Sequence, residues 1–368
     1  MASYEFEDEA ERFDELEALL RAAIENKASD VHIVTNRESS LRIKEEIKKT
    51  DIKVTKSQLT SFCQLHTGGY NDKITQFNID QLFSVDLAIT FEGRRFRVNL
   101  YKSNNGACAV FRLLSDKIPD MTLLNLPQSV GNFINATSGL VLICGATGSG
   151  KSTTIASIVD KINHTRKEVI ITIEDPIEYI YDESRSIIEQ REVGTHVESF
   201  SQATVDALRE DPDIIVVGEM RDLETIKNAI TLAETGHLVF GTLHTKSAID
   251  SIDRMVDIFP PEQQQQIRVQ LASILYGVVH QQLVKSKGKV VALCEVMMVD
   301  PVIANVIKTP NKQQSNSLKE YIRNKSDIGC VHVVDNALWH IRAGRLTVDD
   351  IQYNLTEEDL RLLKARLK

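Results

Sequence analysis

Apolar segments that alternate with amphipathic ones predict the architecture of residues 128–368. Four segments are nearly continuous apolar runs, as is typical of strands that are covered on both faces: GLVLICG, EVIITIED, DIIVVGE and HLVFGTL. Helical patterns separate these runs, so we expect βαβ units that build a parallel sheet. From about residue 261 to the end, the pattern is mostly helical.

A different pattern precedes this part of the chain. Within RRFRVNLY, apolar and polar positions alternate, which predicts a half-buried strand whose outer face carries Arg95, Arg97 and Asn99. The turn sequence SNNG leads into ACAVFRLL, so the two segments form a hairpin. We therefore predict a small α+β domain over residues 1–114, and the two prolines of residues 115–127 indicate a linker.

The first 25 residues form an acidic segment with apolar positions at helical spacing. We predict a helix that docks through its apolar stripe, formed by Phe13, Leu16, Leu19, Leu20, Ala23 and Ile24. Residues 1–30 hold ten acidic and three basic residues, so they contribute −7 to a net charge of −9, and the rest of the chain is nearly balanced. This balance argues against a nucleic-acid partner.

Composition limits the class of protein further. The 368 residues are 42% hydrophobic, and no apolar run reaches the ~18 residues that cross a bilayer, so we expect a soluble protein of about two domains. The five cysteines form no C-x-x-C pair. We interpret them as reduced core residues of a cytosolic protein.

The sequence GATGSGKST fits the phosphate-loop pattern, with a predicted strand before it and a predicted helix after it. Glycines let backbone N–H groups turn toward phosphate oxygens, and the helix N-terminus adds positive charge. Lys151 would neutralise phosphate charge, and the Ser152 hydroxyl would bind Mg²⁺. We predict a nucleoside triphosphate site formed by Gly145, Ala146, Thr147, Gly148, Ser149, Gly150, Lys151, Ser152 and Thr153.

Carboxylates and histidines follow the other predicted strands. Glu219 ends a buried strand, where its carboxylate can hold Mg²⁺ through water. Glu174, Asp175 and Glu178 follow another strand, and one of them can orient or deprotonate the attacking water. His237 and His244 flank a third strand with no metal-ligand cluster nearby, so we expect at least one of the pair to contact the γ-phosphate.

These segments resemble the four boxes of the secretion and type IV pilus ATPases, and within them the pilus retraction branch. In order they are GATGSGKST, TIEDPIEY, LREDPDIIVVGEMRDLETI and AETGHLVFGTLHT. Further matching segments are SDVHI, RFRVN, AVFR, QREVG and IDRMVDIFP, so the resemblance spans about residues 25–300. It implies a RecA-like ATPase domain with a parallel sheet, preceded by a smaller PAS-like α+β domain.

The resemblance also implies roles for particular residues. Glu174 would be the general base, Glu219 the Walker B acid, and His237 and His244 the phosphate-contacting pair. Arginines of the N-terminal domain reach the nucleotide in such proteins, and they match Arg95, Arg97 and Arg112 here. The planar, permanently charged guanidinium suits a phosphate contact.

The resemblance further implies the partners and the location. It predicts a homo-hexameric ring that hydrolyses ATP with Mg²⁺ and powers pilus retraction. The ring would be cytoplasmic and bound to an inner-membrane platform protein, with a sister retraction ATPase as a further partner.

Two departures from the branch leave an alternative open. VIANVIK places Ala304 and Lys308 where retraction motors carry arginines, and a segment with Cys330 replaces a methionine-containing one. The alternative is therefore an accessory nucleotide-sensing subunit that assists another retraction ATPase. A RecA-like DNA translocase is a remote third reading, because no basic stretch interleaved with aromatic residues is present.

Overall fold

The computed structural model describes residues 13–67, 71–114, 117–309 and 312–367, and it divides into two compact units. The first unit holds the described residues up to Lys117 together with Asp175–Ile180 and Glu192–Glu198. The second unit holds Ile118–Glu174, Tyr181–Arg191 and the rest of the chain from Ser199. The chain therefore passes between the units four times after residue 174.

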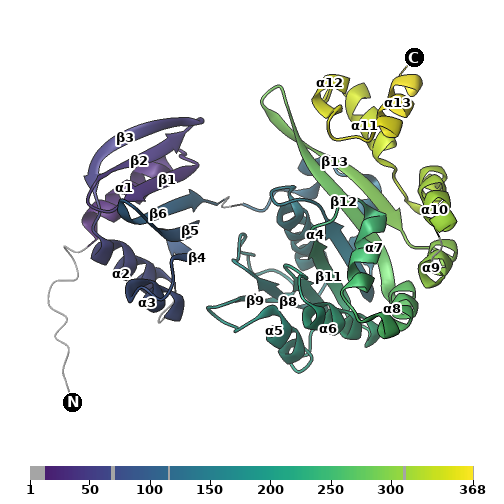
Figure 1. Cartoon of the computed structure of the whole chain (residues 1–368), viewed down its shortest axis with the longest axis horizontal. Coiled ribbons are helices and arrows are strands. Elements are labelled where there is room, and N and C mark those ends of the chain that lie inside the picture. The colour runs from purple at the N-terminus through teal and green to yellow at the C-terminus, as the bar shows by residue number, and fades with distance from the viewer. Residues whose placement is uncertain (1–12, 68–70, 115–116, 310–311, 368) are drawn as a thin grey trace. The chain divides into compact units, whose positions relative to one another are not determined.

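The first unit is built on a six-stranded antiparallel sheet with three helices (Figure 1). The sheet order is β3-β2-β1-β6-β5-β4. Its elements are α1 Asp14–Glu25, β1 Asp30–Val34, β2 Glu38–Ile43, β3 Glu46–Lys53, α2 Lys56–His66, α3 Asp72–Asn78, β4 Ser84–Phe91, β5 Arg94–Ser103 and β6 Gly106–Leu113.

One apolar core joins this sheet to its helices, and the predicted patterns account for it. Leu16, Leu19, Leu20 and Ala23 of α1 are buried in this core, as the helical spacing predicted; residues 1–12 of the same prediction lie outside the described residues. The predicted hairpin is β5 and β6, which pair antiparallel from Phe96–Leu113 to Ser103–Gly106. Burying these side chains stabilises the unit by about 25 cal/mol for each Å² of apolar surface.

The second unit contains a seven-stranded sheet in the order β13-β12-β7-β11-β10-β8-β9. The elements that build and flank this sheet are η1 Met121–Leu124, η2 Gln128–Asn135, β7 Gly139–Cys144, α4 Lys151–Thr165, β8 Val169–Glu174, β9 Ile187–Glu192, α5 Phe200–Ala207, β10 Ile214–Val217, α6 Leu223–Glu234, β11 Leu238–Leu243, α7 Ala248–Asp257, α8 Pro261–Ile274, β12 Leu275–Ser286 and β13 Lys289–Met298. After them come α9 Pro301–Lys308, α10 Lys312–Asn324, η3 Ser326–Ile328, α11 Val333–Arg342, α12 Val348–Ile351 and α13 Glu357–Arg366.

The four apolar runs are the centre of this sheet. β7, β10 and β11 are buried along their whole length, and β12, β7, β11, β10 and β8 run parallel to one another. Parallel strands end at a common edge, so the loops that follow them gather there. All five cysteines are buried and none forms a disulfide.

The region from residue 261 is mostly helical, as predicted, since α8 begins it and α9 to α13 follow, but it also holds β12 and β13, a long antiparallel hairpin that was not predicted and that extends the sheet. Two features differ from the prediction. Residues 118–127 are not a free linker: Ser157 Oγ of α4 donates a hydrogen bond to Pro119 O (2.6 Å). Two short segments of the predicted ATPase domain, Asp175–Ile180 and Glu192–Glu198, belong to the first unit instead.

None of the helices in the described ranges combines the length and apolar character that crossing a bilayer requires. The C-terminal helices α11, α12 and α13 instead pack on the β12–β13 hairpin through a second apolar cluster, which includes Val284, Leu293, Leu338 and Leu363. His340 of α11 is fully buried at this contact.

The hydrogen bonds of His340 fix its neutral form. Arg345 Nε donates to Nδ1 (2.9 Å), so Nε2 carries the proton and donates to Ala292 O of β13 (3.1 Å). Burial, together with the positive charge of Arg345, lowers the pKa of His340 from 6.5 to about 4.

We predict that the free energy of unfolding decreases as the pH falls from 6.5 to about 4, because protons bind the unfolded imidazole first. The difference between these two pKa values, at 1.36 kcal/mol per unit, corresponds to about 3 kcal/mol. Denaturant unfolding of wild type and His340→Gln at pH 7 and pH 4.5 measures this dependence. The variant should lose less stability over this range than the wild type, and His164→Gln, at a half-exposed histidine, should lose as much as the wild type.

Candidate active site

The phosphate loop connects β7 to α4 and is shaped by close approaches of its backbone. Gly145 has a φ of +146°, and a Cβ there would lie 2.3 Å from Gln281 O. Gly150 has a φ of +86° and precedes α4 as its N-cap, with no side chain bonded to the helix N-terminus. A non-glycine residue at either position would be strained, and the N–H groups of the first turn of α4 are available to an anion.

Lys151 lies folded back on this loop. Its Nζ donates to Gly145 O (2.9 Å) and Ala146 O (3.1 Å), and the side chain is only 9% exposed. Ser149 Oγ is buried beside it without a hydrogen-bond partner. A buried hydroxyl without a hydrogen-bond partner destabilises the protein. Such groups are found in binding loops, where a bound ligand supplies the missing hydrogen bond. The loop therefore fits a polyphosphate.

Gln281 of β12 fastens the loop, and no sequence motif pointed to it. Its Nε2 donates to Ser149 O (2.7 Å), and its Oε1 accepts a hydrogen bond from Thr154 Oγ1 of α4 (2.8 Å). The side chain is 2% exposed, so both bonds are shielded from water. Gln281 thus ties the loop to the first turn of the following helix.

Glu219 and His244 lie at the same edge of the sheet as the phosphate loop. They follow the parallel strands β10 and β11, and His244 Nε2 is 3.0 Å from Glu219 Oε1. Burial and the positive charge of Lys151 lower the pKa of His244, so the imidazole is neutral near pH 7 and donates to the carboxylate. Glu219 also pairs with Arg221. An open cleft of about 470 Å³ joins Thr147 of the loop to these residues.

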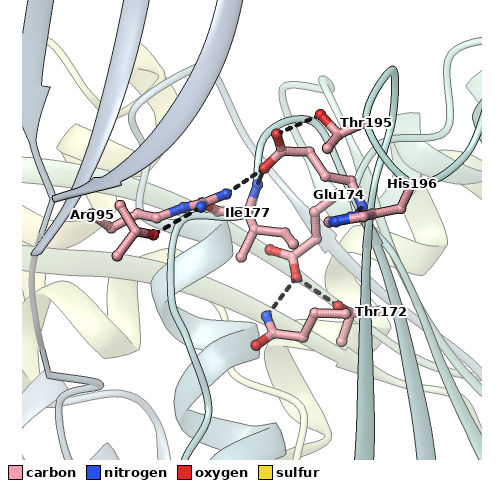
Figure 2. Close-up of polar contacts among 9 residues, drawn as sticks. Arg95, Thr172, Glu174, Ile177, Thr195 and His196 are labelled. Atoms are coloured by element: carbon pink, nitrogen blue, oxygen red, sulfur yellow. Dashed lines mark hydrogen bonds and ion pairs between the residues drawn. The ribbon is translucent and has the colours of Figure 1, made fainter. Parts of the chain in front are cut away.

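Glu174 ends β8 beside β10, again at this edge (Figure 2). Its Oε1 accepts hydrogen bonds from Thr172 Oγ1 (2.7 Å) and from Gln190 Nε2 of β9 (3.2 Å). Two donors on one oxygen fix the orientation of the carboxyl group. Asp175 and Glu178, the other acids of this segment, fall in the first unit, and Asp175 is exposed.

His237 lies at the opposite edge of the sheet, so the structure groups only His244 of the predicted pair with the phosphate loop. It precedes β11, and its carbonyl accepts from Gly139 N (3.0 Å) at the start of β7, the end away from the phosphate loop. A strand rises about 3.3 Å per residue, so His237 lies about 20 Å from His244 along β11. Its Nδ1 contacts Leu232 O (2.9 Å) and Thr235 Oγ1 (3.0 Å), as in a structural histidine.

The three candidate arginines lie on β5 and β6 of the first unit, and each pairs with a carboxylate there. Arg97 Nη2 is 3.2 Å from Asp86, and Arg112 Nε donates to Asp30 Oδ1 (2.9 Å). Arg97 and Arg112 are direct cross-strand neighbours, an unfavourable like-charge pair that the two aspartates offset. Arg95 pairs with Glu192 at 2.5 Å.

The structure thus brings the phosphate loop, Glu174, Glu219 and His244 to one edge of one sheet. The loop can hold a polyphosphate through backbone N–H groups and an ammonium, while the carboxylates can orient water or hold a metal. The sequence analysis assigned no role to Gln281, Thr172, Gln190 or Glu192. The last three lie in the quoted segments TIEDPIEY and QREVG, but the contacts of all four are made through the tertiary structure.

Comparisons with known proteins agree with this geometry. Residues 5–364 match the family model described as Type II/IV secretion system protein. The chain is 41% identical to the type IV pilus retraction ATPase PilT of Pseudomonas aeruginosa over 304 residues, covering 81% of this chain and 87% of the relative. It is 33% identical to the type IV pilus ATPase PilU of the same organism over 356 residues, covering 95% and 91%.

A solved structure supports the same assignment. The crystal structure of the pilus retraction motor PilT with bound ADP matches with a TM-score of 0.75 and 40% identity, covering 87% of this chain and 95% of that chain. The RecA-like domain and the smaller N-terminal α+β domain predicted from the sequence are both present. The chain therefore belongs to the Type II/IV secretion system family of ATPases.

Proposed function

We propose that this chain hydrolyses ATP as a subunit of a homo-hexameric motor that powers type IV pilus retraction. The observation that carries the proposal is the common edge of β7, β8, β10 and β11, where the phosphate loop, Glu174, Glu219 and His244 all lie. The relatives are named for the same reaction and the same machine.

Each group at this edge has a chemical task in the proposal. The loop N–H groups and Lys151 bind the phosphates of ATP, and Glu174, oriented by Thr172 and Gln190, deprotonates the attacking water. His244 Nε2 now faces Glu219, and in the ATP-bound site its single N–H would be donated to the γ-phosphate instead. Ser152 and Glu219 would hold Mg²⁺, Glu219 through water; the ion would neutralise charge on the transferred phosphoryl group.

The N-terminal arginines Arg97 and Arg112 complete the proposal. Their side chains remain 38% and 64% exposed beside their aspartate partners, so each arginine can exchange a carboxylate for a phosphate. Movement of this arginine pair toward or away from the nucleotide would convert hydrolysis into domain rotation. The motor would be cytoplasmic and held at the inner membrane by a platform protein.

An accessory role beside a sister retraction ATPase is the second candidate. One observation favours it: Ala304 and Lys308 stand where retraction motors of this family carry arginines. Both positions lie in α9, which packs on α8 and buries Ile303 and Ile307. In this proposal the two substitutions therefore leave ATP hydrolysis intact and affect only pilus retraction.

The general base can be tested by substitution. We expect Glu174→Gln to bind ATP normally and to lower turnover by ~10²-fold or more, because the amide cannot take a proton from water. Steady-state phosphate release and equilibrium ATP binding measure the two effects, with Lys151→Ala as the blank. Near-wild-type turnover of Glu174→Gln would move the role of base to another carboxylate.

Gln281→Leu should weaken ATP binding about tenfold or more. The leucine leaves Ser149 O and Thr154 Oγ1 buried without hydrogen-bond partners, at a cost of about 1–3 kcal/mol each. The loop is then no longer held in the conformation that binds phosphate, and each 1.4 kcal/mol lost from binding corresponds to about tenfold in the dissociation constant. Gln282→Leu is the matched control, since that neighbouring side chain bonds Asn354 instead. The dissociation constant of ATP, measured by calorimetry, should change only for the first variant.

The motor and the accessory role differ in their concentration dependence. For the motor we expect the ATPase rate to rise more than in proportion to protein concentration, because neighbours in the ring complete each site. A rate no greater than that of Lys151→Ala at every concentration would favour the accessory role. If adding a sister ATPase to this chain then restored ATP hydrolysis, that ATPase would be identified as the partner.

A further inference from the structure

The carboxylate of Glu192 is the centre of a buried polar network in the first unit. Its partners Arg95, Ile177 and Thr195 are labelled in Figure 2. Oε2 accepts hydrogen bonds from Arg95 Nη2 (2.5 Å) and from the backbone N–H of Ile177 (3.1 Å), while Oε1 accepts from Thr195 Oγ1 (3.1 Å). Glu192 is only 3% exposed. A buried carboxylate is tolerated when a cation and further donors surround it, as they do here.

Ile177 is held at both of its backbone polar groups. Glu192 accepts from its N–H, and Arg95 Nε donates to its carbonyl (3.3 Å). Arg95 is itself oriented by Nη1, which donates to Thr90 Oγ1 (3.2 Å) of β4. Arg95, Glu192 and Ile177 therefore form a closed ring of three partners, which we call the Ile177 clamp.

The position of this clamp in the chain connects it to Glu174. Ile177 follows Glu174 by three residues, and Glu192 follows Gln190, the donor to Glu174, by two. One carboxylate thus holds both segments that lead away from the Glu174–Gln190 contact. Glu192 N also donates to His196 Nδ1 (2.9 Å), which fixes the backbone of the second segment.

We propose that Arg95 and Glu192 are positioning residues for the general base Glu174, and that Arg95 acts through the Ile177 clamp rather than on the phosphates. The inference rests on the proposed role of Glu174. The clamp restricts the two segments on either side of the Glu174–Gln190 contact, so the carboxyl group keeps its orientation toward the water.

The chemistry of the pair fits this role. Arginine presents several donors in one rigid plane, so it can bind Glu192, Ile177 O and Thr90 at once. Lysine keeps the charge but cannot make this set of bonds. Misplacing a catalytic group by about 1 Å can cost ~10²-fold in rate, so loss of the clamp should lower turnover strongly.

The test uses the full chain and the variants Arg95→Gln, Glu192→Gln and their combination. We expect each single variant to lower kcat about 10- to 100-fold while the dissociation constant of a non-hydrolysable ATP analogue stays within about twofold. The double variant should be no slower than the slower single one, because the two residues act as a unit. Arg95→Lys, a milder change, should fall between wild type and Arg95→Gln.

Glu92→Gln is the matched control. It removes another ion pair of the same unit, between Glu92 and Arg21 (2.7 Å), and should leave kcat unchanged. All rates are measured at a temperature below the thermal unfolding midpoint of every variant. Wild-type kcat in both single variants, or losses that multiply in the double variant, would overturn the inference.

Two outcomes separate this inference from its basis. A higher dissociation constant for the ATP analogue in Arg95→Gln but not in Glu192→Gln would place Arg95 on the phosphates and overturn the clamp. Glu174→Gln, measured in parallel, tests the base itself: if it is inactive while Glu192→Gln is fully active, the clamp fails and the proposed function stands. Near-wild-type turnover by Glu174→Gln would overturn the clamp inference and move the role of base to another carboxylate, while the proposed ATPase function would stand.

Discussion

The common direction of five neighbouring strands is the constraint on which the site depends. Because β12, β7, β11, β10 and β8 run parallel, the residues that follow them gather at one edge, although they are far apart in sequence. The same geometry separates the two histidines of one motif. His244 follows β11 and meets Glu219, whereas His237 precedes that strand and lies at the other edge.

Local patterns sufficed for the elements whose burial follows from their own residues. The buried strands β7, β8, β10 and β11, the β5–β6 hairpin and the apolar stripe of α1 could all be predicted, since period and turn residues encode them. The phosphate loop was also predictable, because its glycines are needed for local backbone reasons. The β12–β13 hairpin was missed, although Lys287 and Gly288, both with positive φ, form its turn.

Contacts made through the tertiary structure could not be predicted in this way. Gln281 meets the phosphate loop across 132 positions of sequence, and Glu192 meets Arg95 across 97. The arginines were assigned a nucleotide contact only by resemblance to a family, and the structure distinguishes them. The Arg95 side chain is 16% exposed and pairs with buried Glu192, while Arg97 and Arg112 are 38% and 64% exposed. The division of the chain into units also depends on long-range packing. For this reason the sequence analysis assigned Asp175–Ile180 and Glu192–Glu198 to the second unit, whereas they belong to the first.

The two adjacent glutamines of β12 have a consequence for divergence within the family. Successive side chains of a strand point to opposite faces, so Gln281 contacts the phosphate loop and Gln282 contacts Asn354, between α12 and α13. One strand therefore supports the nucleotide loop on one side and the C-terminal helices on the other. Selection can remodel the C-terminal helices while the opposite face of the same strand continues to support the phosphate loop.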